Sequence, residues 1–151
     1  MLKKSKTDKL FNNQFLMVLL GLLTKNGKRS KSKKILLDTL YDFKLNSKTL
    51  DRNFISFLDS SLQNILFRFV FKYRRKGKNK EIIPVPLNSD EIVYINTIRF
   101  LLKNLRKFKG NFFSKKLLKE LEESSKNSGL VKKEIMSLNK LVIANRKFMN
   151  S

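Results

Sequence analysis

The sequence has no cysteine and no histidine among its 151 residues. Zinc sites built from these residues are therefore excluded, as are thiol nucleophiles and every triad or general-base mechanism that uses imidazole. The chain also has no disulfide framework, which permits a reducing compartment without indicating one. Carboxylates are left as the main candidates for metal binding or acid–base catalysis.

Acidic residues are scarce as well: 12 Asp and Glu stand against 34 Lys and Arg, for a net charge of +22 and a pI near 10.4. Self-repulsion of this size opposes compaction unless a partner of opposite charge neutralises it. Nucleic acid is the first partner that this balance predicts, and an anionic membrane surface is the second. Because the positive charge is spread along the chain, it favours a protein embedded in RNA over an enzyme with a basic appendage.

Long hydrophobic runs are missing. The longest apolar run, from Phe15 to Leu23, is far shorter than the roughly 20 residues of a membrane-spanning helix. A secretory signal is an alternative interpretation, but basic residues follow the run where a small-residue cleavage site would stand, so a buried first helix fits better. Hydrophobic residues still make up 41% of the chain, which predicts one folded domain with a core.

Apolar spacing predicts a mainly α single domain of about six helices. Residues 1–9 are expected to form a basic N-terminal arm, and residues 10–151 the helical domain. Asn26-Gly27 ends the first helix, and Ser47, Ser89 and Asn111 are expected to cap later ones. The helices are expected at about residues 9–24, 30–43, 47–66, 89–105, 111–129 and 131–148. The fourth is expected to bury Ile92, Ile95, Ile98, Leu102 and Leu105.

A protruding basic β-hairpin is predicted at about residues 67–87. Its first strand alternates aromatic and other residues with the period of two that is typical of strands. The turn is expected at residues 75–80, where Gly77 can adopt positive φ. Pro84 and Pro86 lack an N–H donor, which confines the return strand to an edge or to a free two-stranded arm. The basic tip predicts a polyanionic target.

Candidate catalytic residues are few. Glu120, Glu122, Glu123 and Glu134 are the acids that could suggest a metal cluster, but we interpret them as solvent-facing ion pairs with nearby lysines. Asp90 and Glu91 are better explained by the start of a helix. No glycine-rich phosphate-binding pattern is present. The sequence therefore predicts that the chain is not an enzyme and that it uses no cofactor, no metal and no small-molecule substrate.

Six basic clusters along the chain favour phosphate contacts over ordinary solvated faces. Only 8 of the 34 cations are Arg, so the pair Arg74-Arg75 stands out, since guanidinium binds phosphate or a guanine edge in bidentate fashion. Tyr73 is the best candidate for stacking on an unpaired base, whereas the preceding Phe stripe is expected to pack the hairpin root on helices. The candidate nucleic-acid-binding residues are Lys28, Arg29, Lys31, Lys33, Lys34, Lys72, Tyr73, Arg74, Arg75, Lys76, Lys78, Arg99, Arg106, Lys107, Lys115, Lys116, Lys132, Lys133, Arg146 and Lys147.

Several short motifs occur in an order that is typical of one family. Asn26-Gly27-Lys28-Arg29-Ser30 is similar to its Asp-Gly-Lys-Lys-Ser turn, and Lys72-Tyr73-Arg74-Arg75-Lys76-Gly77 to its Lys-Ser-Arg-Arg-Val-Gly-Gly hairpin tip. The further matches are Ile83-Pro84-Val85, Arg99-Phe100, Glu120-Leu121, Gly129-Leu130-Val131-Lys132-Lys133 and Ala144-Asn145-Arg146-Lys147-Phe148. As an ordered set, they resemble the family of small-subunit ribosomal protein seven, the universal S-seven family, from about Leu10 to Phe148.

The resemblance implies a structural constituent of the small ribosomal subunit. Such a protein binds the 3′ major (head) domain of the rRNA, supports head assembly beside neighbouring ribosomal proteins, and holds its hairpin near exit-site tRNA and the mRNA exit path. No membrane is implied. The residues that the resemblance assigns to rRNA or tRNA contacts are Lys28, Arg29, Arg74, Arg75, Lys132 and Lys133.

The chain departs from the family pattern in its short basic arm, its short tail and Lys78, which replaces the second hairpin glycine. Its favoured residues, Lys, Asn, Phe, Ile and Leu, have AT-rich codons. The shortened ends and the AT-biased composition predict an organellar protein, mitochondrial before plastid.

Two rival hypotheses remain open at this point. A stand-alone basic nucleic-acid-binding module, with a helix-turn-helix around Gly27, would bind duplex DNA comparably well. A cationic membrane-surface protein would use its first helix to bind anionic vesicles in the absence of RNA.

Overall fold

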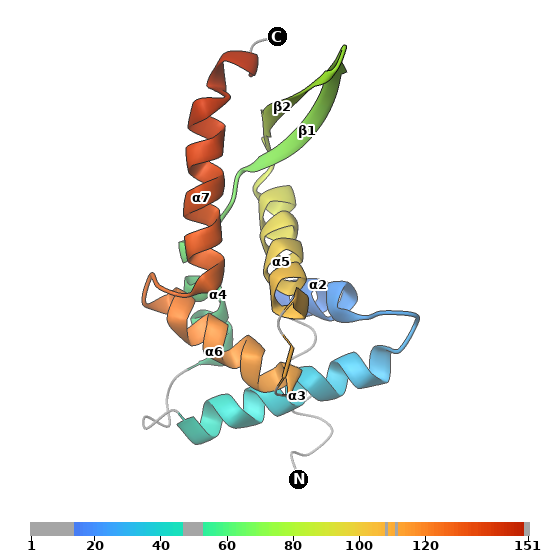
Figure 1. Ribbon diagram of the computed structural model, residues 1–151. Coiled ribbons are helices and arrows are strands. Elements are labelled where there is room, and N and C mark those ends of the chain that lie inside the picture. The colour runs from blue at the N-terminus through green and yellow to red at the C-terminus, as the bar shows by residue number, and fades with distance from the viewer. Residues whose placement is uncertain (1–13, 47–52, 108, 111, 150–151) are drawn as a thin grey trace. The chain divides into compact units, whose positions relative to one another are not determined.

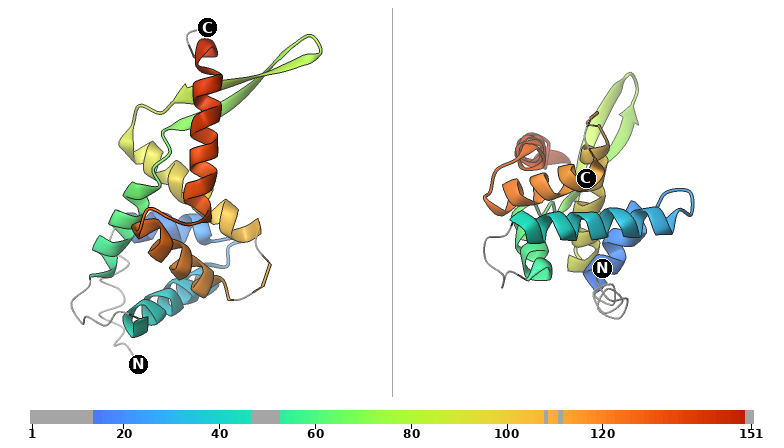
Figure 2. Two further views of the ribbon diagram at one scale, coloured as in Figure 1. Left: turned by 60° about the vertical axis from the view of Figure 1, so that its left-hand side comes forward. Right: turned by 90° about the horizontal axis from the view of Figure 1, so that it is seen from below.

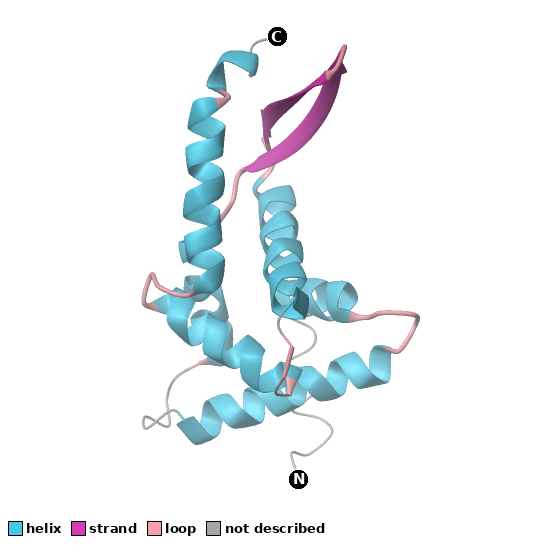
Figure 3. Cartoon of the chain, in the orientation of Figure 1, coloured by secondary structure: helices cyan, strands magenta, loops and turns pink. Residues whose placement is uncertain are grey.

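The computed structural model describes residues 14–46, 53–107, 109–110 and 112–149. Figures 1 and 3 show a chain of helices with one pair of strands. The elements are α2 (Gln14–Leu23), α3 (Arg29–Asn46), α4 (Phe54–Asn64), β1 (Phe69–Lys76), β2 (Asn79–Pro86), α5 (Asp90–Lys107), α6 (Phe113–Ser125), α7 (Leu130–Ala144) and the 3₁₀ helix η1 (Arg146–Phe148). The described residues thus confirm a mainly α chain of six α-helices with one hairpin. The expected arm at residues 1–9 and the expected caps Ser47 and Asn111 lie outside them.

The chain divides into two compact units, which comprise residues 1–56 with 98–119 and residues 57–97 with 120–151. The first unit buries, among other side chains, Leu16, Leu19, Leu20, Leu36, Leu40, Phe43, Phe54, Ile98, Leu101, Leu102, Leu105, Leu117 and Leu118. The second buries Leu58, Leu62, Ile65, Phe67, Val93, Leu121, Val131, Ile135 and Val142. The single domain and its basic arm stay predictions.

In the first unit, the turn between α2 and α3 is the one that the sequence predicts. Asn26 (φ 53°) and Gly27 (φ 70°) both adopt left-handed backbone, the conformation that Gly and Asn tolerate best. The Arg29 N–H then donates to the Gly27 carbonyl at 2.8 Å. The turn therefore ends one helix and starts the next within a few residues, and it places a basic segment at the beginning of α3.

In the second unit, the hairpin register explains why two prolines are tolerated. The strands pair antiparallel, with Phe71 opposite Pro84 and Phe69 opposite Pro86. The Leu87 N–H donates to the Arg68 carbonyl at 2.8 Å. Because ladder bonds recur at every second pair, the N–H groups missing at Pro84 and Pro86 would have pointed away from β1. The sheet has two strands, as predicted for a free arm.

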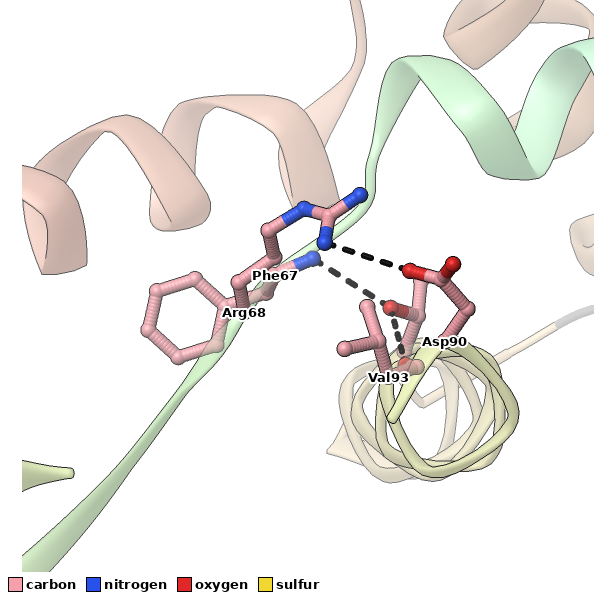
Figure 4. A network of polar contacts seen from close by, with 5 residues as sticks. Phe67, Arg68, Asp90 and Val93 are labelled. Atoms are coloured by element: carbon pink, nitrogen blue, oxygen red, sulfur yellow. Dashed lines mark hydrogen bonds and ion pairs between the residues drawn. The ribbon is translucent and has the colours of Figure 1, made fainter. Parts of the chain in front are cut away.

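The hairpin root is fixed to the start of α5 by buried polar contacts (Figure 4). The Phe67 N–H donates to Thr97 Oγ1 at 3.3 Å, and Thr97 Oγ1 donates to the Val93 carbonyl at 2.8 Å. Thr97 is fully buried. Arg68 adds an ion pair to Asp90 at 3.2 Å, but both side chains are more than half exposed, so this pair contributes little. The buried threonine is the main polar anchor of the root.

Thr97→Val is expected to lower the free energy of unfolding by about 1–2 kcal/mol, because it leaves the buried Phe67 N–H without its acceptor while the volume hardly changes. Arg68→Ala is the matched control and is expected to cost at most about 0.5 kcal/mol. Urea unfolding followed by circular dichroism measures both. A larger loss in the arginine variant would show that the exposed ion pair anchors the root.

Two predictions about the helices are wrong in detail. Ile92, expected to face inward, is 52% exposed, whereas its neighbour Val93 is buried. Val93 and Thr97 are buried beside the hairpin root in place of Ile92. Further along α5, Ile98, Leu102 and Leu105 are buried as predicted. The last helix was expected to continue to residue 148, but α7 ends at Ala144 and a 3₁₀ turn follows.

The corner between α6 and α7, also in the second unit, is built around a buried acid. Asn127 has left-handed backbone (φ 57°), and the Ser128 N–H donates to the Glu123 carbonyl at 2.9 Å, which caps α6. Gly129 then adopts φ 104° and ψ 168°, a conformation almost restricted to glycine. A Cβ at this position would lie 2.8 Å from Glu120 Oε1, so any side chain there would displace that carboxylate.

Glu120 Oε1 accepts a hydrogen bond from the Val131 N–H at 2.8 Å, although Glu120 is only 5% exposed. A carboxylate placed at the first turn of α7 also meets the positive end of that helix dipole. The interpretation of Glu120 as a solvent-facing ion-pair residue is therefore wrong. Its carboxylate is a structural group that holds the start of α7.

Candidate nucleic-acid-binding surface

The hairpin tip has a tighter turn than the sequence predicts. The strands stay paired as far as Lys76 and Asn79, and the turn consists of Gly77 and Lys78 alone. Gly77 has φ 63°, as expected for a tight hairpin turn. Arg75, predicted to lie in the turn, is a strand residue. The basic side chains are consequently held by a regular ladder and not by a loose loop.

The pairing brings two cations together across the ladder, because Arg75 lies directly opposite Lys80. Like charges in this arrangement repel each other and destabilise a bare hairpin. Six cations and one acid, Glu81, occupy β1, β2 and the turn, so the tip has little to neutralise it internally. An anion bound between the two strands would relieve the repulsion, which is the electrostatic condition expected of a phosphate-binding tip.

Tyr73, Arg75 and Lys80 line a hollow of about 500 Å3 on one face of the hairpin. Tyr73 is 72% exposed, and it shares this face with Arg75 because alternate strand residues point the same way. A planar aromatic ring beside two cations is suited to a nucleotide, whose base can stack while its phosphate meets the charges. Figure 2 shows the tip of the hairpin extending away from α7.

The phenylalanines below Tyr73 contact one another at the root of the hairpin, and their packing on helices stays a prediction. Phe67 is buried, and its ring centroid lies 6.2 Å from that of Phe69 and 6.0 Å from that of Phe71. These tilted ring contacts stabilise the root of the hairpin. Tyr73 is thus the only aromatic residue of the described hairpin that stands at the tip.

The other predicted binding residues of the second unit lie on α7 and η1. Lys132 donates from its ammonium to the Asn64 carbonyl, and Asn64 in turn donates to the Ser124 and Ser125 carbonyls. Lys132 therefore links α4, α6 and α7 internally, while Lys133 is exposed. Arg146 and Lys147 are exposed on η1, which packs against β2. The unit thus carries ten of the predicted binding residues.

The other ten predicted residues belong to the first unit. They occupy the start of α3, the exposed side of α5 and the start of α6, and they are Lys28, Arg29, Lys31, Lys33, Lys34, Arg99, Arg106, Lys107, Lys115 and Lys116. Most are exposed, and Lys33 and Lys116 are half-buried. Arg106 donates to the Leu22 carbonyl at 3.4 Å, which ties α5 to α2. Each unit thus presents its own basic set.

No group of acidic residues in the part of the chain that the structure describes is arranged to hold a metal ion. Along the same residues, no helix combines the length and apolar character that crossing a bilayer requires.

The predicted set of binding residues omits Lys80 and Phe112. Lys80 lies opposite Arg75, and a two-residue turn of Gly77 and Lys78 would have paired them. Phe112 is exposed beside the basic start of α6, and the doublet Phe112-Phe113 is its only signal in the sequence.

Comparison with known proteins identifies the family. The model of the ribosomal protein S7p/S5e family matches residues 2–146. The chain is 27% identical over 141 residues to small ribosomal subunit protein uS7 of Wigglesworthia glossinidia brevipalpis, covering 93% of this chain and 88% of that protein. It is 24% identical over 143 residues to small ribosomal subunit protein uS7c of Tetradesmus obliquus, covering 95% and 84%. The predicted family and the prediction that the chain is not an enzyme are confirmed: the chain belongs to the ribosomal protein S7p/S5e family.

Proposed function

We propose that this protein is a structural constituent of the small ribosomal subunit and that it binds the 3′ major (head) domain of the rRNA. Both relatives named above are small-subunit proteins, and the family is ribosomal. The observation that carries the proposal is the presence of an exposed basic set on each compact unit of a chain with net charge +22. Folded rRNA is a polyanion large enough to engage both sets.

The binding mechanism follows from charge and shape. Each Lys or Arg that neutralises a phosphate releases condensed counterions, so the affinity falls steeply as salt rises. Phosphate contacts position the protein without reading sequence. Specificity then comes from the match between RNA tertiary structure and helices held by their own cores. In this scheme the protein supports assembly of the head together with neighbouring small-subunit proteins.

The hairpin is proposed to lie near exit-site tRNA and the mRNA exit path. A free two-stranded arm has no sheet partner, and its exposed tip combines Tyr73 with cations on both faces. Such an arm can enter a space between RNA strands that a helical body cannot enter.

We place the protein in mitochondrial ribosomes, with plastid ribosomes as the alternative, because its favoured residues have AT-rich codons. Immunodetection in ribosomes purified from each organelle decides between them.

After a high-salt wash, the protein is expected to co-migrate with the small ribosomal subunit when a native lysate is sedimented through a sucrose gradient. Electrostatic contacts alone would weaken under such a wash, whereas shape-matched burial in folded rRNA persists. Immunoblotting of the fractions measures the distribution. Release to the top of the gradient, with equal affinity for duplex DNA, would instead indicate a stand-alone nucleic-acid-binding module.

A further inference from the structure

Phe112 is the most exposed large hydrophobic side chain among the residues that the structure describes, at 76%. Burying a phenylalanine side chain removes apolar surface from water and stabilises a protein, and the Phe112 ring lacks most of this stabilisation. Its neighbour Phe113 is half-buried and begins α6, so the two rings have different environments. The exposed ring is not part of the core of the first unit.

The backbone at Phe112 is held in place by α6. The Lys116 N–H donates to the Phe112 carbonyl at 3.3 Å, which is the first hydrogen bond of the helix. Leu117 and Leu118, in the next turn, are buried in the core of the same unit. The ring therefore projects from a fixed point and has only its two side-chain torsions to lose when a partner covers it.

The surroundings of the ring are positive. Residues 107–119 include five lysines and no acidic residue. The Lys115 ammonium lies over the Phe112 ring, 5.9 Å from its centroid, within the range of a cation–π contact. Lys109 and Lys115 are both exposed. A partner that covers the ring must offer a flat apolar face and negative charge together.

We propose that Phe112 and Lys115 form a stacking site for an unpaired RNA base, an inference that rests on the proposed function. A single-stranded nucleotide supplies both requirements, since its base stacks on the ring while a flanking phosphate meets the Lys115 ammonium group. A neighbouring protein that received the ring in an apolar pocket would have to desolvate or pair the lysines around it, which is costly. The chemistry therefore favours RNA over protein as the occupant.

The test is binding of the full chain to a transcript of the 3′ major domain of small-subunit rRNA. Phe112→Leu is expected to weaken binding about tenfold, which corresponds to about 1.4 kcal/mol, because the aliphatic side chain cannot stack. Phe112→Tyr keeps the ring and should bind like the unmodified chain. Leu45→Ala, at a position 66% exposed in the same unit, is the matched apolar control and should change nothing.

The salt dependence separates stacking from charge. Phe112→Leu should leave the slope of log affinity against log salt unchanged, because a phenyl ring releases no counterion. Lys115→Gln should lower the slope by about 0.7, the value for one contact to a single strand. Circular dichroism of each variant verifies that the helices are retained.

Unmodified protein that fails to bind the transcript would overturn the proposed function and the stacking site with it. Normal binding by the unmodified chain and equal binding by Phe112→Leu would overturn the stacking site alone. A photoreactive p-benzoylphenylalanine at position 112 provides a second readout in native subunits. A crosslink to an rRNA nucleotide supports the site, and a crosslink to a protein neighbour overturns it.

Discussion

Glu120→Ala is expected to lower the free energy of unfolding by about 3 kcal/mol. The carboxylate is 5% exposed and accepts the Val131 N–H at 2.8 Å, and Val131 is itself only 1% exposed. Hydrogen bonds to charged groups are worth about 1.5–3 kcal/mol, and a buried donor that loses its acceptor costs about 1–3 kcal/mol. Alanine removes the acceptor without supplying another, so the start of α7 loses its buried anchor.

Thermal or urea unfolding monitored at 222 nm measures the loss, which for a chain of this size corresponds to a fall of about 10 °C in melting temperature. Glu122→Ala, two residues along the same helix and half exposed, is the matched control and should stay within about 0.5 kcal/mol of the unmodified chain. Glu120→Gln retains an acceptor oxygen and should lose about 1 kcal/mol. A Glu120→Ala variant as stable as the Glu122→Ala control would contradict the anchoring role.

A buried acid is difficult to predict because the usual rule places carboxylates in water. The sequence nevertheless contains a signal, since Leu117, Glu120 and Ser124 are spaced by three and four residues and share one face of α6. All three are buried. What the spacing cannot supply is the partner, because Val131 follows a turn whose shape depends on Gly129.

The hairpin was predictable to different degrees along its length. Near the root, alternating Phe67, Phe69 and Phe71 reveal the strand. Pro84 and Pro86 left an edge strand or a free two-stranded arm open, and the sheet has two strands. At the tip the alternation disappears into consecutive cations, so the sequence suggested a longer turn. Backbone pairing needs no apolar side chains, and the ladder continues through the charges to Lys76 and Asn79.

The basic clusters could be predicted from the sequence, but their distribution between the two compact units could not. Composition identifies cations without indicating which of them have internal roles, and Lys132 and Arg106 both donate to backbone carbonyls within their own units. Which cations share a unit follows from how α5 and α6 contribute to each core, a property of tertiary packing and not of any single cluster.

The double substitution Arg74→Ala with Arg75→Ala is expected to weaken binding of deacylated tRNA to reconstituted small subunits about tenfold at physiological salt. Adjacent strand residues point to opposite faces, so Arg75 lies on the side of Tyr73 and Lys80 while Arg74 lies on the side of Glu81. The two guanidinium groups therefore address RNA on both sides of the arm. Their removal should eliminate one or two phosphate contacts. Each lost contact should lower the slope of log affinity against log salt concentration by about 0.7–0.9.

Folding should be nearly unaffected by this change. Both arginines are exposed at the tip, beyond the aromatic contacts and the Thr97 anchor that hold the root. Loss of the Arg75 cation also removes its repulsion with Lys80, and this stabilises the hairpin by about 0.2–1 kcal/mol. Helicity by circular dichroism and incorporation into subunits are the measurements, and both should match those of the unmodified chain.

Net charge must be controlled, because any loss of two cations weakens nonspecific attraction to RNA. Lys126→Ala with Lys140→Ala removes the same charge from two exposed positions of the same unit, outside the hairpin. This control should retain tRNA binding within about twofold, a difference of about 0.4 kcal/mol. If both double variants weakened tRNA binding equally, the hairpin would contribute only general positive charge. Loss of most helicity in the arginine variant would show that the tip is required for folding. A selective loss of tRNA binding in the arginine variant, with subunit assembly intact, is the result expected if the arm contacts RNA directly through its two faces.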